Sequence, residues 1–393
     1  MPLLYVHVPF CIQKCAYCAF YSLSRGESSE KLISQYLEGL ELEMIKRQKD
    51  APQGVSSLFI GGGTPTVLNH EQLECLMKTM NQYFQFESRA EMTVEGNPGT
   101  ISTEKLRVLR NYGINRFSLG IQSFDDGLLS KAGRIHSARQ AREAIKRLRK
   151  EGFNNLNFDL MFGLPGQNLQ LWRASLEEAL SHQPEHFSLY GLMLEEGTPF
   201  YDKYMVAAED RVDVVKGRNL PDNNLPDDDL QAEMYAWATE RLAKEGYTQY
   251  ETSNFARPGF ECRHNLGYWR GEDYIGLGPG AVSCLKRVRQ KNIEDVHLYV
   301  HFLKKGQTPL DEEGQEVLSL KECMAERMIL GLRLKEGVDL TAFRRDFGAD
   351  LRDIYREVLE RYKHRDIFEI KDEHLCLNPK YSFVANGILQ EFV

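Results

Sequence analysis

Short apolar runs alternate with amphipathic stretches through the first two hundred residues. The runs are LLYVHVPF, VSSLFIGGG, AEMTVEGNP, RFSLGIQSF, NNLNFDLMFGLPG and HFSLYGLML, and each ends in Gly, Pro or a polar residue. Helical spacing follows them, for example at residues 31–48, 70–84, 103–113 and 137–152. Strands that alternate with helices form βαβ units and a parallel sheet. One mononucleotide-binding half of a doubly wound sheet needs fewer than six strand–helix units. The pattern therefore favours an α/β fold with a partial (β/α)6 TIM-like barrel over a flat doubly wound sheet.

Polar residues stand at or near the ends of three predicted strands. They are Glu95, Gln122 and Asp159. In parallel α/β folds the carboxyl ends of the strands carry the functional site. Each residue alone could equally cap a helix or close a turn, but three on successive units favour a site.

The alternation of apolar runs and amphipathic stretches ends after residue 202. From this change and later ones we expect four parts in the chain. Residues 1–202 form the barrel, and 203–229 form an acidic connecting segment that contains NLPDNNLPDDD. Residues 230–310 begin with a helix, capped by Asp227 or Asp228, and continue into a Gly- and aromatic-rich stretch. Helices followed by the hairpin IFEIKDEHLCLNP predict a winged-helix-like domain at 311–393. Because its charges of both signs are interspersed, we expect a structural or docking role.

Composition and charge narrow the functional classes. The chain has 42% hydrophobic and 27% charged residues, which argues against disorder, and a net charge of −8 gives no reason to expect nucleic acid as a partner. No apolar run is long enough to span a bilayer, and the N-terminus lacks a basic leader region. We therefore expect a cytoplasmic protein, in which closely spaced thiols bind metal or do chemistry.

Three cysteines lie within eight positions of the first predicted loop. Cys11, Cys15 and Cys18 form C-x3-C-x2-C. Structural zinc takes four protein ligands, so zinc would need a distant fourth. A [4Fe–4S] cluster normally takes four thiolates, and three would leave one iron open for another ligand. An open metal position is typical of a reactive site, whereas ordinary buried thiols would not gather so closely.

The triplet resembles that of the radical S-adenosylmethionine (SAM) enzymes, with Tyr17 before its last cysteine and GGGTP at 61–65. The resemblance implies a partial barrel and a [4Fe–4S] cluster on the three cysteines, with SAM as the ligand of the open iron. It also implies an electron donor such as a flavodoxin. Electron transfer to the sulfonium would then release methionine and a 5′-deoxyadenosyl radical.

A narrower resemblance joins the chain to oxygen-independent coproporphyrinogen III oxidases and the HemW-type haem chaperones. It rests on YVHVPFCIQKCAYCAF, FIGGGTPT, VEGNP, SLGIQSF and DLMFGLPGQ. It places SAM contacts at Tyr5, Tyr17, Gly62, Gly63, Thr64, Glu95, Gln122, Arg134 and Asp159. His7 and His136 fall in the same stretches, and we expect them to form hydrogen bonds around the site.

Two departures from the oxidase favour the chaperone. The oxidase pattern continues to a further cysteine where this chain has Phe20, and the cluster begins at residue 11, which leaves no room for the oxidase's N-terminal extension. The sequence HNLGYW also matches H-N-x-x-Y-W, a motif associated with haem binding in the chaperone group.

The motif supplies His264, Asn265, Tyr268 and Trp269. A neutral imidazole is a common haem ligand, and Tyr and Trp offer flat apolar faces to a porphyrin. Cys262 is an alternative iron ligand. In the structural alternative, the His and Asn form hydrogen bonds within a loop while the Tyr and Trp pack a domain junction.

The sequence therefore predicts a haem chaperone that carries a [4Fe–4S] cluster and SAM and delivers haem to haem-dependent acceptors, among them respiratory membrane proteins. Family analogy adds a homodimer and peripheral membrane association. The first rival is a coproporphyrinogen III oxidase, which decarboxylates propionates to vinyl groups. The second is a non-catalytic scaffold that keeps its cluster for folding or dimerisation. Whether SAM is cleaved stays open.

Overall fold

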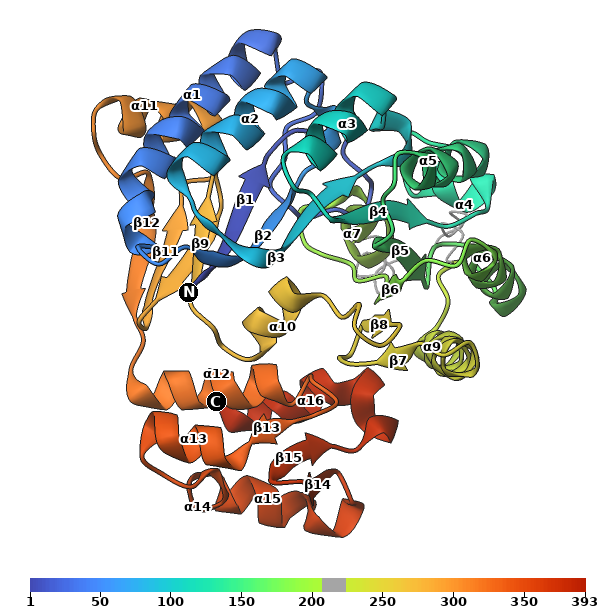
Figure 1. Cartoon of the computed structure of the whole chain (residues 1–393). Helices are drawn as coiled ribbons and strands as arrows, with labels where there is room; N and C mark the ends of the chain where they lie inside the picture. The colour runs from blue at the N-terminus through green and yellow to red at the C-terminus, as the bar shows by residue number, and fades with distance from the viewer. Residues whose placement is uncertain (207–223) are drawn as a thin grey trace.

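Six parallel strands and the helices between them build the first half of the molecule (Figure 1). The computed structural model describes residues 1–206 and 224–393, so most of the expected 203–229 segment lies outside the described residues. The strands are β1 (Leu3–Val8), β2 (Val55–Gly62), β3 (Phe86–Gly96), β4 (Arg116–Gln122), β5 (Leu156–Phe162) and β6 (His186–Gly191). The helices are α1 (Glu30–Arg47), α2 (His70–Tyr83), α3 (Thr103–Asn111), α4 (Asp126–Lys131), α5 (Ala138–Lys150) and α6 (Leu169–Ser181). The four helical stretches that the sequence predicts are therefore confirmed.

The strand order has the topology of a barrel that remains open. β1 to β6 lie in chain order and each pairs in parallel with the next, whereas a doubly wound sheet would reverse its order. The sheet continues at both edges, because β9 pairs in parallel with β1 and β8 pairs antiparallel with β6. The predicted barrel topology is confirmed, within a sheet of twelve strands.

The segment between the barrel strands and the C-terminal domain adds six strands that the sequence analysis did not predict. Most of them are too short to show an alternating pattern, and β12 is mostly polar. The elements are α7 (Pro199–Tyr201), α9 (Asp228–Lys244), β7 (Thr248–Gln249), β8 (Asn254–Ala256), α10 (Arg263–Trp269), β9 (Tyr274–Leu277), β10 (Val282–Leu285), β11 (Val288–Asn292), α11 (Val296–Lys304) and β12 (Leu310–Val317). Asp227 caps α9 by accepting from the backbone N–H of Leu230 at 2.8 Å, as predicted.

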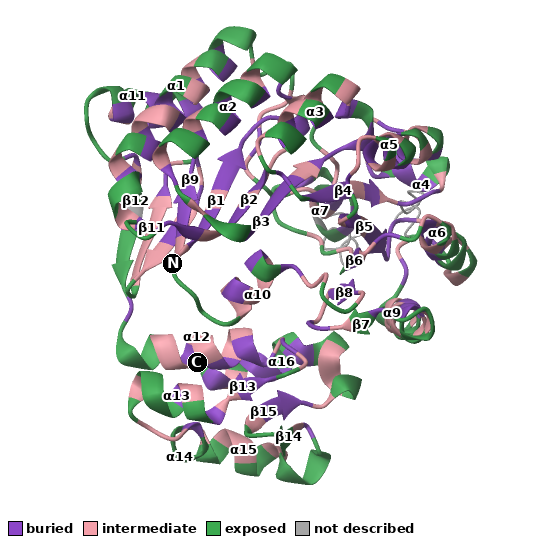
Figure 2. Cartoon of the chain, in the orientation of Figure 1, coloured by how far each residue is buried: buried purple, intermediate pink, exposed green. Residues whose placement is uncertain are grey.

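The two faces of the barrel strands differ in chemistry, although both are largely buried (Figure 2). Alternate side chains such as Leu58, Val94 and Phe117 belong to the large apolar cluster shared with the covering helices. Such burial contributes roughly 1.5–3 kcal/mol for each large side chain. The intervening positions carry polar groups such as Ser57 and Glu95. The concave face of the sheet is therefore largely polar, and the other face packs against the helices through apolar side chains.

The C-terminal domain has its own hydrophobic cluster and the element order of a winged helix. Its elements are α12 (Leu320–Gly331), β13 (Val338–Asp339), α13 (Leu340–Phe347), α14 (Leu351–Ile354), α15 (Arg356–Tyr362), β14 (Phe368–Lys371), β15 (His374–Leu377) and α16 (Ala385–Leu389). The sheet order is β13-β15-β14, and β14 and β15 form the predicted hairpin. The order of these elements agrees with the winged-helix-like prediction, but the domain begins at α12 and not at residue 311, because β12 pairs with β11 in the large sheet.

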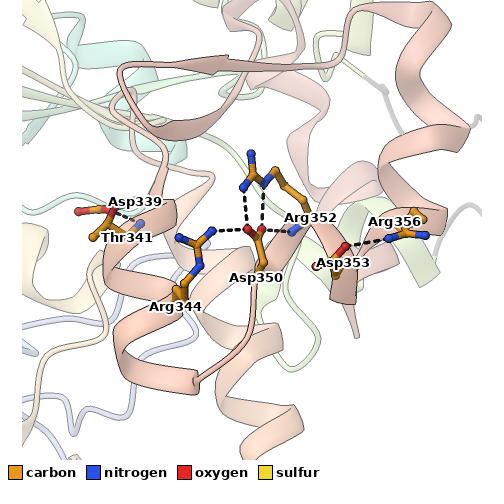
Figure 3. A network of polar contacts seen from close by, with 7 residues as sticks. All are labelled: Asp339, Thr341, Arg344, Asp350, Arg352, Asp353 and Arg356. Carbon is orange, nitrogen blue, oxygen red and sulfur yellow. Dashed lines mark hydrogen bonds and ion pairs between the residues drawn. The ribbon is translucent and has the colours of Figure 1, made fainter.

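Ion pairs connect the ends of the short helices α13, α14 and α15 in this domain (Figure 3). Asp350 accepts from the backbone N–H of Arg352 and from its guanidinium, at 2.9 and 2.6 Å, and also pairs with Arg344. The bond from Arg352 is the main reason why the pKa of Asp350 lies far below its usual value. This carboxylate therefore caps α14 and ties it to α13.

No helix within the described ranges combines the length and the apolar character needed to cross a membrane.

Candidate functional site

The three motif cysteines lie on the loop that follows β1. All three thiols are free and partly exposed. The loop is closed at its base by the bond from Cys11 N–H to the carbonyl of Leu23 at 2.9 Å. Burial raises the pKa of Cys11 and of Cys18. The loop therefore presents three sulfur atoms from one segment at the carboxyl end of the first strand.

The glycine motif after β2 is bonded directly to the cysteine loop. The backbone N–H of Thr64 donates to the carbonyl of Phe10 at 2.8 Å, and Thr64 Oγ1 lies 3.6 Å from Cys11 Sγ. Gly62 has a φ of 106°. A Cβ there would lie 2.5 Å from Nδ1 of His7, so both the backbone angle and the space require glycine.

Arg134 and Gln122 bring partly unpaired polar groups to the same end of the barrel. Arg134 donates from Nη1 to Cys15 Sγ at 3.4 Å and from Nη2 to the carbonyl of Gly120 at 2.5 Å. Its Nε and the Oε1 of Gln122 are buried without a partner. Gln122 has a φ of 66°, in the left-handed region that side chains avoid. Because buried polar groups normally have partners, these atoms indicate a ligand position.

Two carboxyl groups face the same space from β3 and β5. Burial, reinforced by repulsion from Asp159, raises the pKa of Glu95 to about 8. Burial also raises the pKa of Asp159, although it accepts from Ser118 Oγ at 3.0 Å and Asn157 Nδ2 at 2.8 Å. A cationic or hydroxyl-bearing ligand would relieve this repulsion.

These residues fit a [4Fe–4S] cluster and SAM. Three thiols on one loop are the donor type that such clusters take. The unpartnered Arg134 Nε and Gln122 Oε1 offer one donor and one acceptor to a small ligand beside them. The predicted contacts from Gly62 to Asp159 therefore converge at one end of the barrel. Tyr17 packs beside them, against the small apolar cluster around Leu128 and Met161.

A cavity of about 450 Å³ connects the cysteine loop with the HNLGYW motif. Its walls include Phe20 from the loop, Tyr5 and Phe59 from the strands, and His264 and Tyr268 from α10. Phe20 is 69% exposed. The volume lies within the usual range for small-molecule sites. An imidazole, phenols and flat apolar rings around one space fit a haem group.

His264 is held tightly at this cavity. Its Nδ1 lies 2.8 Å from Ser57 Oγ and its Nε2 lies 3.1 Å from the hydroxyl of Tyr268. Burial, aided by the positive charge of Arg116, lowers the pKa of His264 to about 3. The imidazole is therefore neutral, which is the form that binds iron, but both of its nitrogens have partners.

The structure separates some of the predicted haem residues. Asn265 lines the cavity with His264 and Tyr268, whereas Trp269 is not among the lining residues. Trp269 instead lies 5.7 Å from the guanidinium carbon of Arg333, at the C-terminal domain. The motif forms a helix and not a loop. Trp269 thus follows the junction-packing alternative, while the other three face the cavity.

Cys262, His7 and His136 have structural partners. Cys262 is fully buried and lies 3.3 Å from Glu91, so its geometry does not support the alternative of an iron ligand. His7 Nε2 donates to the carbonyl of Tyr21 at 2.9 Å, and His136 Nε2 donates to that of Ile121 at 3.2 Å. The prediction that both histidines form hydrogen bonds around the site is confirmed.

Sequence reasoning missed the strand residues that meet α10. They are Ser57, Phe59, Glu91 and Arg116. Each is an ordinary residue of a predicted strand, and its partner lies far away in the chain. The one available signal was that Glu91 and Arg116 are charged residues at the starts of predicted strands.

Comparison with known proteins identifies the barrel and the C-terminal domain. The model of the radical SAM superfamily matches residues 5–179, and that of the HemN C-terminal domain matches 318–380. The chain is 35% identical to the heme chaperone HemW of Lactococcus lactis subsp. lactis, with 99% of this chain and 96% of that protein covered. It is also 35% identical to the heme chaperone HemW of Bacillus subtilis, with 99% and 98% covered. Coproporphyrinogen III oxidase (HemN) from Escherichia coli, a radical SAM enzyme, superposes with a TM-score of 0.82 at 24% identity, over 100% of this chain and 90% of that one, and so shares the fold.

Proposed function

Because the chain belongs to the heme chaperone HemW family of the radical SAM superfamily, we propose that it binds haem and delivers it to haem-dependent acceptor proteins. The observation that carries the proposal is the shared cavity. Phe20 from the cysteine loop and His264 and Tyr268 from the haem motif line the same 450 Å³ space. The two motifs therefore serve one ligand position, next to the loop that would hold the cluster.

The SAM end of the barrel would hold its two groups through residues that already point there. Cys11, Cys15 and Cys18 would ligate a [4Fe–4S] cluster, which supplies one electron to the SAM sulfonium when reduced. Arg134 would turn its unpartnered Nε toward the carboxylate of SAM. Glu95 would accept from a ribose hydroxyl or an amino group of SAM.

The haem end would use residues of α10 and the strands beneath it. His264 would bind the iron through Nε2, once the hydroxyl of Tyr268 releases that atom. Phe20 and Phe59 would cover a porphyrin face with apolar rings. The proposal includes acceptors among respiratory membrane proteins, a flavodoxin-type electron donor, a cytoplasmic location, a homodimer and peripheral membrane association.

Haem titration of the anaerobically reconstituted protein tests the proposal. We expect a Soret band that saturates at one haem per chain and weakens at least tenfold in affinity in His264→Ala. His70→Ala, which changes an exposed histidine of α2, should bind as the wild type does. Transfer to apomyoglobin, followed as the growth of its own spectrum, should be complete within minutes. Haem binding no better than that of an unrelated control protein would refute the proposal.

The oxidase remains the second candidate because the same cavity adjoins the cysteine loop. Supplying SAM, dithionite and coproporphyrinogen III separates the candidates, with mass spectrometry of the porphyrin and of 5′-deoxyadenosine. We expect the porphyrinogen to remain unchanged. A decarboxylated product would establish the oxidase instead, and failure to bind SAM would favour the scaffold.

A further inference from the structure

The haem-motif helix α10 is capped by a residue from a distant strand. Its own N-cap residue, Cys262, makes no side-chain capping bond. Instead the carboxylate of Glu91, on β3, accepts from the backbone N–H groups of Arg263 and His264, each at 3.1 Å. It also accepts from Cys262 Sγ at 3.3 Å. Since the first N–H groups of a helix need acceptors, Glu91 fixes where α10 begins.

This carboxylate is buried, and a buried positive charge lies nearby. Glu91 is 7% exposed and Arg116 is 2% exposed. Burying a carboxylate is costly, and the positive charge of Arg116, which interacts electrostatically with Glu91, reduces that cost. The start of α10 is thus tied to the concave face of the barrel by a charge-assisted contact that water hardly reaches.

The neighbouring strand holds the ring of the same histidine. Ser57 on β2 lies directly beside Glu91 in the β2–β3 register. Its Oγ lies 2.8 Å from Nδ1 of His264, and Ser57 is 1% exposed. Two adjacent positions of the sheet therefore hold one residue, Glu91 by its backbone N–H and Ser57 by its imidazole.

Imidazole chemistry gives this arrangement a function. A histidine binds metal through the nitrogen that carries no proton, and the hydrogen bond of the other nitrogen selects which one that is. When Ser57 Oγ accepts from Nδ1–H, Nε2 is left bare, and the hydroxyl of Tyr268 can donate to it until a ligand arrives. Tyr268 and His264 both line the cavity.

We propose that Ser57 and Glu91 are positioning residues for haem binding, which make Nε2 of His264 the iron-binding atom and aim it into the cavity. The inference rests on the proposed haem function. Neither residue touches the haem in this arrangement, and both act through His264. Their effect should therefore disappear when His264 itself is removed.

Haem affinity and the spectrum of the bound ferric haem test the inference on the full-length protein. Ser57→Ala should raise the haem Kd about tenfold and shift the Soret maximum and the EPR g-values. Ser57→Thr, which keeps the hydroxyl, should restore both. Glu91→Gln should give a mixture of ligation states, whereas Glu87→Gln, an exposed change on the same strand, should match the wild type.

A double-mutant comparison separates positioning from a general loss of structure. In the His264→Ala background, Ser57→Ala should change the haem Kd by less than about twofold. If Glu91→Gln does not fold, the haem affinity and spectra of the Ser57 variants still test the positioning role. Normal haem binding by the wild type with unchanged affinity and spectra in Ser57→Ala would overturn this inference alone. Absence of haem binding by the wild type would overturn the proposed function and this inference together.

Discussion

Glu95→Gln should stabilise the protein at neutral pH while it removes SAM binding. The carboxylate of Glu95 lies on the concave face, beside Gly61, where a Cβ would come within 2.8 Å of Oε2. Burial, with repulsion from Asp159, raises the pKa of Glu95 from 4.5 to about 8. A carboxyl group that resists ionisation in the folded state favours unfolding whenever the solution forces it to ionise.

The magnitude follows from the two pKa values. Because the folded pKa exceeds the unfolded one, the contribution of Glu95 to stability is fully present below pH 4.5 and is lost as the pH rises toward 8. At 1.36 kcal/mol per pKa unit, the loss is about 1 kcal/mol at pH 5 and about 3 kcal/mol at pH 7. Gln does not ionise, so its advantage over Glu should grow by about 2 kcal/mol between these pH values.

Urea unfolding of the cluster-free protein at pH 5, 6, 7 and 8 measures this difference. Glu87→Gln serves as the matched control, since Glu87 is exposed on the same strand, and should change stability by less than about 0.5 kcal/mol at every pH. A constant difference between Glu95→Gln and wild type across the range would refute the reasoning. So would a loss of stability that is larger at pH 7 than at pH 5.

Calorimetry of SAM binding tests the raised pKa of Glu95 in a second way, through the protons that are released. If a positively charged group of SAM pairs with Glu95, binding at pH 7 must release close to one proton, because the carboxyl is mostly protonated beforehand. The apparent binding enthalpy should then depend on the ionisation enthalpy of the buffer. Release of no proton by the wild type would show that no positively charged group of SAM pairs with an ionised Glu95.

Three further substitutions probe the core, the cavity and the cluster loop. Phe158→Ala should cost about 3–5 kcal/mol in urea unfolding, because Phe158 is 0% exposed in the main core. Phe20→Ala should weaken haem binding about tenfold in a Soret titration, since it removes an apolar wall, whereas Met193→Ala, another exposed apolar residue, should not. Arg134→Lys should lower the cluster potential by on the order of 40 mV in an EPR redox titration, because the bond to Cys15 Sγ is lost.

The sequence predicts the barrel strands because each carries its own pattern. Runs such as LLYVHV and RFSLGIQ are six and seven residues long and have a clear boundary. The strands β7 and β8 have two and three residues, too few for any alternation. They exist because β6 offers an edge for pairing, and that is a tertiary cause.

The candidate site also has one part that the local sequence predicts and one part that only the folded structure brings together. Cys11, Cys15 and Cys18 form a local motif, and their spacing alone indicates a metal-binding loop. Glu91 meets α10 more than 170 residues later, and only the folded register places it there. The motif helix itself was unexpected because it contains Gly267. That glycine is required by contact, since a Cβ there would lie 2.7 Å from the side chain of Leu3.

The pairing of β1 with β9 has a consequence for biosynthesis. β1 lies between β2 and β9, with Leu3 beside Ser57 on one side and Tyr274 on the other. The ribosome makes roughly 5–20 residues per second, so on the order of 15–50 seconds separate the synthesis of Leu3 from that of Tyr274. The strand that carries the thiol loop thus gains its neighbour β2 long before it gains β9. A nascent chain stalled before residue 274 should therefore expose an open edge of β1, which is available for pairing with another strand.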